Sequence, residues 1–199
     1  MEKISIKFNA DNIKKLSDLI FILIENIVVS FDKIVPVYLD FYKPMIENEI
    51  ALANISNKDK ILHVGCGSIP ATSINIVKKT DADVTAIDKN IKCIKKAQSL
   101  ISNIKLSNKI KIIYSDALNF PLEKFNLIIV SLGVKPYEEV LKYISQNMEN
   151  DARIIVRTNS TVDGQLAEKD LMLKEIFKLD RIIYQKKNGL MISVLLSKK

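Results

Sequence analysis

A short apolar run that breaks into two glycines constrains the fold of this chain more than any other feature. Residues 61–64 are apolar apart from His63, and Gly65, Cys66 and Gly67 follow before a helix-like pattern resumes. Two glycines between a strand and a helix let the backbone approach a ligand with no Cβ in the way, and the start of the helix directs unpaired amides toward that ligand. The pattern predicts a nucleotide-cofactor turn.

Acidic residues follow the next two strand-like runs. Asp88 follows the run 83–87, roughly twenty residues beyond the glycines, where α/β nucleotide folds have a carboxylate on the ribose hydroxyls. Asp116 comes soon after the run 110–114, and its carboxylate can accept a hydrogen bond from an adenine amino group. We therefore expect the glycine turn and these two carboxylates to bind one cofactor.

Taken in order, the glycine turn, Asp88 and Asp116-Ala117 resemble the cofactor signature of class I S-adenosylmethionine-dependent methyltransferases, over roughly residues 60–199. The resemblance implies that the glycine turn lies against the methionine part of the cofactor. It also implies that Asp88 binds the ribose and that Asp116 contacts adenine. The resemblance to enzymes that use NAD is weaker.

Two positions depart from that family. His63 stands where an acidic residue is common, and Ile69 replaces a third glycine. Because His63 lies in a predicted buried strand, a core histidine with satisfied hydrogen bonds fits it better than a catalytic base. The cofactor-binding residues that we predict are Gly65, Cys66, Gly67, Asp88, Lys89, Asp116, Ala117 and Ser131.

A second resemblance accounts for these departures. The run 65–74, GCGSIPATSI, is similar to the glycine turn of nicotianamine synthases, and segments 42–52 and 152–159 resemble two further segments of that family. That family shares the fold but not the reaction. The second resemblance implies transfer of the aminocarboxypropyl group of S-adenosylmethionine to an amine, whereas the first implies transfer of the methyl group. S-adenosylmethionine is the expected cofactor in both cases.

Alternating strand-like and helix-like runs predict an α/β, Rossmann-like fold with a mostly parallel seven-stranded sheet. The expected strands are 60–64, 83–87, 110–114, 125–131, 152–158, 180–185 and 190–197, and the expected helices are 11–30, 36–54, 70–80, 89–102, 137–148 and 166–177. Asn188-Gly189 predicts a hairpin that makes the last pair antiparallel. Residues 1–56 are expected to form an N-terminal helical segment on the substrate side, and residues 57–199 the S-adenosylmethionine-binding domain.

Catalytic and substrate-binding candidates precede the glycine turn and follow the later strands. Tyr42, Glu47 and Glu49 could orient or deprotonate an amine, since both transfers need an uncharged nucleophile near the sulfonium. The same three residues also fit a solvated helix face. Arg157 suits either a bidentate clamp on a carboxylate or a surface ion pair. The substrate-binding set that we predict is Tyr137, Arg157 and Asn159.

Composition limits the class of partner. The 199 residues suffice for one domain, and the chain carries a formal net charge of +7. Because the lysines are dispersed and the densest lysine region lacks interleaved aromatics, the sequence argues against nucleic acid as a partner. Two cysteines, no secretory pattern and no apolar run long enough for a bilayer favour a cytoplasmic protein without a membrane partner. We expect a small-molecule substrate, and the oligomeric state stays open.

Several chemistries are disfavoured by what the motifs lack. Residues 131–137, SLGVKPY, do not carry the polar and aromatic motif of amino-directed methyltransferases, which argues against methylation of DNA bases. One histidine and two distant cysteines form no usual metal-ligand pattern, and the chain has no G-x-S-x-G elbow. The leading hypothesis is methyl transfer to a small molecule. Aminocarboxypropyl transfer is the alternative, and a non-catalytic S-adenosylmethionine-binding protein is the second.

Overall fold

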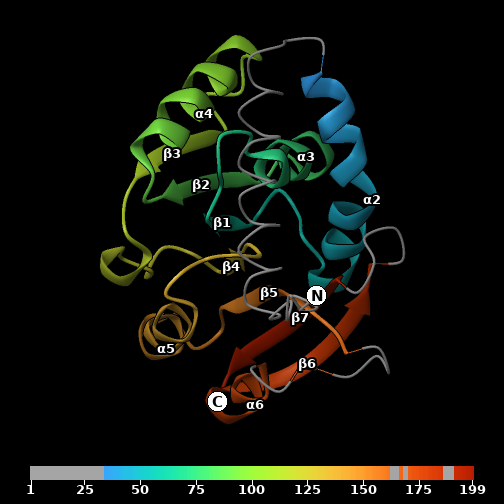
Figure 1. Cartoon of the computed structure of the whole chain (residues 1–199), viewed down its shortest axis with the longest axis vertical. Helices are drawn as coiled ribbons and strands as arrows, with labels where there is room; N and C mark the ends of the chain where they lie inside the picture. The colour runs from blue at the N-terminus through green and yellow to red at the C-terminus, as the bar shows by residue number, and fades with distance from the viewer. Residues whose placement is uncertain (1–33, 162–165, 168–169, 186–190) are drawn as a thin grey trace, which may run out of the picture.

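A seven-stranded mixed sheet forms the centre of the molecule (Figure 1). The computed structural model describes residues 34–161, 166–167, 170–185 and 191–199. The strands are β1 (Lys60–Val64), β2 (Asp83–Asp88), β3 (Ile110–Tyr114), β4 (Leu127–Val130), β5 (Arg153–Asn159), β6 (Phe177–Tyr184) and β7 (Met191–Lys198). The helices are α2 (Val35–Ala53), α3 (Ala71–Thr80), α4 (Ile91–Asn103), α5 (Tyr137–Asn147) and α6 (Met172–Ile176), with a 3₁₀ turn η1 (Ala117–Asn119).

The strand order is β3-β2-β1-β4-β5-β7-β6. The first five strands in this order pair in parallel, while β7 runs antiparallel to both β5 and β6. The predicted Rossmann-like sheet with an antiparallel C-terminal pair is therefore confirmed. The order reverses between β1 and β4, and ligands of open α/β sheets bind beyond the carboxyl ends of the strands at such a point.

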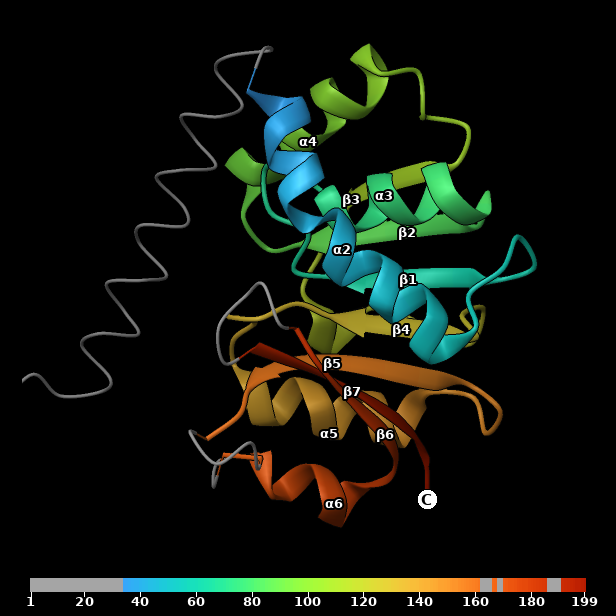
Figure 2. The same ribbon diagram turned by 90° about the vertical axis from the view of Figure 1, so that its right-hand side faces the viewer.

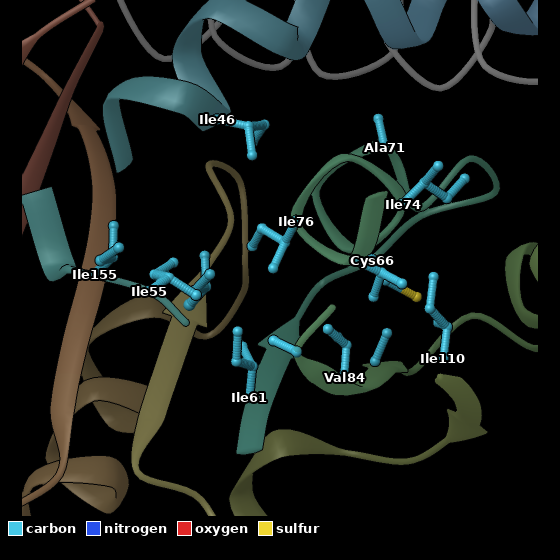
Figure 3. Close-up of a cluster of buried hydrophobic side chains, with 14 of the residues drawn as sticks. Ile46, Ile55, Ile61, Cys66, Ala71, Ile74, Ile76, Val84, Ile110 and Ile155 are labelled. Carbon is cyan, nitrogen blue, oxygen red and sulfur yellow. The ribbon is translucent and has the colours of Figure 1, made fainter. Parts of the chain in front are cut away.

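Two apolar clusters cover the two faces of the sheet. α2, α3 and α4 pack on one face, and Figure 3 shows Ile46, Ile61, Ile74 and Ile155 within this cluster. On the other face, α5 and α6 pack over a cluster that includes Phe177. All four residues of β4 are buried because helices cover both sides of this parallel strand.

α2 is the helix that matters most for the site. A proline at its start, Pro36, suits the first turn, and the helix ends where Asn54 adopts a left-handed conformation with φ 52°. The helix packs against α3 (Figure 2), and its Ile46 is fully buried. None of the described helices combines the length and apolar character needed to cross a membrane.

Most predicted elements agree with the structure to within one or two residues, but the helix predicted over 166–177 is wrong. Leu166 forms an isolated bridge with Ser160, and the described helix is only α6. Phe177 instead begins β6, three residues earlier than expected, because it pairs with Lys198 on β7, and its side chain is fully buried. The predicted helix 11–30 and the Asn188-Gly189 turn lie outside the described residues.

Candidate functional site

A cavity of about 520 Å³ lies at the carboxyl ends of the parallel strands. Its walls are the glycine turn after β1, the ends of β2 and β3, the loop after β4, part of β5 and one side of α2. This volume is in the range of small-molecule sites. All eight predicted cofactor residues line it: Gly65, Cys66, Gly67, Asp88, Lys89, Asp116, Ala117 and Ser131.

The glycine turn has a conformation that other residues rarely adopt. Gly65 has φ +77° and Gly67 has φ +65°, both in the left-handed region. A Cβ on Gly65 would also lie 2.7 Å from Cγ2 of Val134, a distance at which one of the two must move. The amides of Gly65 and Cys66 both donate to the Ile87 carbonyl, which ties the turn to β2. Glycine is therefore required at position 65 for both backbone and space.

Asp88 braces this turn as well as facing the cavity. Its Oδ2 accepts a hydrogen bond from the Gly67 amide at 3.0 Å, and its Oδ1 accepts one from the Asn90 amide at 2.8 Å. A carboxylate has about four acceptor sites, so Asp88 can still accept the two donors of a ribose diol. Asp116 accepts at Oδ1 from the Leu118 amide at 3.0 Å and retains acceptor capacity in the same way. The residues present fit an adenosine-containing cofactor.

His63 is a neutral residue in the cavity wall. Its Nδ1 lies 2.9 Å from Ser73 Oγ and its Nε2 lies 2.9 Å from Ser131 Oγ. Burial, with a further contribution from the charge of Arg157, lowers the pKa of His63 from 6.5 to about 3. The satisfied core histidine expected from the sequence is thus what the structure contains, and the ring is too weak a base to hold a proton at neutral pH.

Arg157 forms a fork with a protein carboxylate. Its Nε and Nη2 donate to the two carboxylate oxygens of Glu49 at 2.8 and 2.7 Å, and its Nη1 donates to Thr72 Oγ1 at 2.8 Å. Ser193 Oγ donates to Glu49 Oε1 at 2.6 Å. Arg157 is 5% exposed and Glu49 is 0% exposed. The bidentate face of Arg157 is therefore occupied by Glu49, in a buried rather than a surface ion pair.

The three catalytic candidates on α2 lie in three different environments. Tyr42 lines the cavity, together with Tyr38 and Met45. Glu49 is buried behind this wall, and Glu47 lies on another side of the helix, where it pairs with Lys79 at 3.3 Å. Tyr38 and Met45 are cavity residues of α2 that are absent from the predicted site, although their spacing of four and three residues from Tyr42 places all three on one side of a helix.

The three predicted substrate residues do not all lie at the cavity. Arg157 lines the cavity, whereas Tyr137 and Asn159 are not among its described lining residues. The Tyr137 hydroxyl donates to Asp170 Oδ1 at 2.8 Å, and Thr158 Oγ1 donates to Asp170 Oδ2 at 2.6 Å. Burial and the neighbouring Asp170 raise the pKa of Tyr137 well above its usual range. Tyr137 is a brace between α5 and the end of β5, and Asn159 is exposed at the last position of β5.

A family model described as "Nicotianamine synthase protein" matches residues 27–196. This chain belongs to the nicotianamine synthase family. The membership confirms a transferase that depends on S-adenosylmethionine, with S-adenosylmethionine as its cofactor. A search of the curated proteins found no match.

Solved structures show that the fold is shared with this family and with methyltransferases. A mutant of MtNAS in complex with S-adenosylmethionine has a TM-score of 0.75 and 17% identity, covering 87% of this chain and 70% of that one. MtNAS in complex with MTA and tNA has a TM-score of 0.73 and 18% identity, covering 88% and 68%. A putative S-adenosylmethionine-dependent methyltransferase from Methanococcus maripaludis has a TM-score of 0.64 and 16% identity, covering 100% and 97%.

Proposed function

We propose that this nicotianamine synthase family member transfers the aminocarboxypropyl group of S-adenosylmethionine to an amine and releases methylthioadenosine. The family match over residues 27–196 is the observation that carries the proposal. Methyl transfer to a small molecule, the leading hypothesis from the sequence, becomes the second candidate. It is favoured by the likeness to the Methanococcus maripaludis protein, which extends over the whole chain.

The proposed reaction is a direct displacement. Bound S-adenosylmethionine supplies a carbon activated by the adjacent sulfonium. The amine lone pair forms the new C–N bond at this carbon, the C–S bond breaks with its electron pair remaining on sulfur, and the nitrogen loses one proton to solvent. The protein has to hold the two reactants in line and keep competing water away, which accounts for large rate effects without a covalent intermediate.

The residues of the cavity divide between the two reactants. The amides of the glycine turn are bonded to Ile87 and Asp88, so this turn contributes space for close approach of the cofactor, while Asp88 and Asp116 bind the cofactor through their carboxylates. On α2, which forms another part of the cavity wall, the hydroxyl of Tyr42 can orient the acceptor amine by a hydrogen bond. His63 does not take the amine proton at neutral pH, because the pKa of its ring is about 3. Positioning by Tyr42 is therefore the role that we assign to α2.

The by-product tests the proposal. The protein is incubated with S-adenosylmethionine and an equimolar mixture of the standard amino acids and simple diamines, and the products are separated by chromatography and identified by mass. We expect methylthioadenosine together with an acceptor that has gained an aminocarboxypropyl group. S-adenosylhomocysteine with a methylated acceptor would favour the second candidate. Formation of neither by-product would contradict both candidates for these acceptors, and Asp88→Ala serves as the control for cofactor-dependent turnover.

A further inference from the structure

One side of α2 carries both the cavity wall and a buried charge. Tyr38, Tyr42, Met45 and Glu49 are spaced by four, three and four residues, so they form a single stripe along the helix. The first three line the cavity, whereas Glu49 is fully buried and bonds to residues outside α2. The two tyrosine rings also contact each other, with centroids 4.9 Å apart. Movement of Glu49 would therefore move the wall that contains the tyrosines.

The partners of Glu49 join this stripe to the rest of the site. Arg157 connects Glu49 to β5 and, through Nη1, to Thr72 at the start of α3. Ser193 connects Glu49 to β7. Because Thr72 Oγ1 accepts from the guanidinium, its own hydroxyl proton must point elsewhere, and Thr72 lines the cavity. The network thus holds Thr72 of α3 in the cavity wall and, through Glu49, also holds the part of the wall that α2 forms.

The network extends one step further along α2. Asn48 donates to Gln185 Oε1 at 2.9 Å, and Gln185 Nε2 donates to Ser193 Oγ at 3.0 Å. Gln185 and Ser193 are both buried, at 2% and 0% exposure. Two successive residues of α2 are therefore held by groups at the antiparallel end of the sheet, which fixes both the height and the rotation of the helix.

Stability alone is a weak reason for such a pair. Burial of two charges costs several kcal/mol, and well-packed apolar residues in their place are often as stable or more stable. A bidentate fork, in contrast, fixes direction as well as distance. We infer that the Glu49–Arg157 pair is a positioning unit that sets Tyr42 and Thr72 relative to the glycine turn, an inference that rests on the proposed transfer reaction.

The chain offers a matched control on the same strand. Arg153 lies four residues before Arg157 on β5 and donates through Nη2 to Asp59 Oδ1 at 2.7 Å. Asp59 is buried at 4% exposure, and neither Arg153 nor Asp59 lines the cavity. Replacement of this second pair removes an arginine–carboxylate contact of β5, together with the Arg153 Nε bond to the Ala53 carbonyl at the end of α2, without replacing a residue that lines the cavity.

The test removes each pair completely. Glu49→Met/Arg157→Met is compared with Asp59→Leu/Arg153→Met for thermal unfolding, S-adenosylmethionine affinity, kcat and KM of by-product formation, and hydrogen exchange of residues 38–45. We expect the first double variant to fold and to bind S-adenosylmethionine within about threefold of the wild type. We expect its kcat to fall at least about tenfold (~1.4 kcal/mol), with faster exchange in residues 38–45. The control variant keeps its kcat and its exchange in that segment.

Each other outcome has a defined meaning. A folded Glu49→Met/Arg157→Met protein with unchanged kcat and unchanged exchange in residues 38–45 overturns the inference. If that variant does not fold, Arg157→Lys keeps the charge but loses the fork, and an unchanged kcat in Arg157→Lys overturns it equally. If the wild type releases no methylthioadenosine, the proposed reaction fails by itself. Exchange in residues 38–45 then decides the positioning role without any reference to turnover.

Discussion

The proposed cofactor side and the proposed acceptor side of the cavity are built in different ways. On the cofactor side, Asp88 accepts from the amide of Gly67, 21 residues away, across neighbouring strands. On the acceptor side, Arg157 and Glu49 are 108 residues apart, and Ser193 and Glu49 are 144 residues apart. The cofactor side thus depends on backbone groups within one βαβ unit, whereas the acceptor side depends on buried charges from distant elements.

Because of this difference, we expect substitutions on the two sides to reduce different properties of the protein. A backbone turn with left-handed glycines fails through local strain, and the loss appears as weaker cofactor binding. A buried ion pair fails when one partner is removed, because the other charge stays in the core without compensation. The acceptor side should therefore show the larger losses of stability, and the cofactor side the larger losses of affinity.

Removal of one member of the buried pair has the largest expected effect. Arg157→Met leaves Glu49 fully buried without its counter-charge, and we expect the free energy of unfolding to fall by about 3–5 kcal/mol. Arg153→Met should cost less, about 1–2 kcal/mol, because Asp59 keeps its bond from the Ser56 amide. Urea unfolding measures both variants. Equal losses would contradict the difference between Glu49, which is left without its counter-charge, and Asp59, which keeps its bond from the Ser56 amide.

A methyl group on the glycine turn comes next. Gly65→Ala combines a left-handed backbone with a Cβ 2.7 Å from Val134 Cγ2, so we expect a loss of stability of about 2–3 kcal/mol and much weaker cofactor binding. Gly65→Ala/Val134→Ala removes the overlap but not the backbone strain. This double variant should recover only part of the affinity by calorimetry. Full recovery of the affinity would mean that glycine is required at position 65 only by the overlap with Val134 and not by the left-handed backbone.

The lowered pKa of His63 should make the stability of the protein depend on pH. Its folded pKa is about 3, below the value of 6.5 taken for the unfolded chain, so only the unfolded state binds the proton between these values. The free energy of unfolding is therefore unaffected by this group above pH 6.5 and falls as the pH is lowered toward 3. Between pH 7 and pH 5 the expected loss is about 2 kcal/mol. His63→Gln should remove this component in urea unfolding at the two pH values, and an unchanged pH slope would contradict the assignment.

Asp88 tests the cofactor side with less effect on the fold. Asp88→Ala should weaken S-adenosylmethionine binding at least about tenfold, or ~1.4 kcal/mol, since it removes the proposed acceptors for the ribose and the acceptor that holds the Gly67 amide. Calorimetry on the wild type and the variant measures this. Asp88→Asn keeps one acceptor oxygen and should bind with intermediate affinity. An alanine variant that binds as tightly as the wild type would remove Asp88 from the cofactor site.

Glu47 has the smallest expected effect. Its ion pair with Lys79 joins side chains that are 43% and 60% exposed, and such pairs contribute little. Glu47→Gln should change the free energy of unfolding by less than about 0.5 kcal/mol and leave by-product formation unaltered. A large loss of kcat in this variant would restore Glu47 as a catalytic candidate, against its location on α2.

The same contrast explains what the sequence could predict. Strand ends, the glycine turn and the two carboxylates follow from local spacing, and all eight predicted cofactor residues line the cavity. Pairing between Glu49 and Arg157 has no local signal, because it depends on how α2 packs across the sheet. The prediction groups Glu47 and Glu49, although helical spacing already separates them: Glu49 lies seven residues after Tyr42, on the same side of a helix, whereas Glu47 lies five residues after it, on another side.

The wrong helix prediction over 166–177 has a related cause. Leu166, Leu173 and Phe177 share helical spacing, yet all three are buried by tertiary contacts of different kinds. Leu166 bridges to Ser160, Leu173 belongs to α6 and Phe177 pairs with Lys198 on β7. Apolar periodicity could not distinguish one continuous helix from three successive structures that all pack on the same core.

Isotope-labelled S-adenosylmethionine tests the central claim most directly. The cofactor carries one label in its methyl carbon and another in its methionine carboxyl carbon, and the products formed with the reactive acceptor are analysed by mass spectrometry. Aminocarboxypropyl transfer predicts that the methyl label stays with the adenosine-containing by-product while the carboxyl label moves to the acceptor. A methyl label on the acceptor, with the carboxyl label retained in the adenosine-containing by-product, would contradict the account.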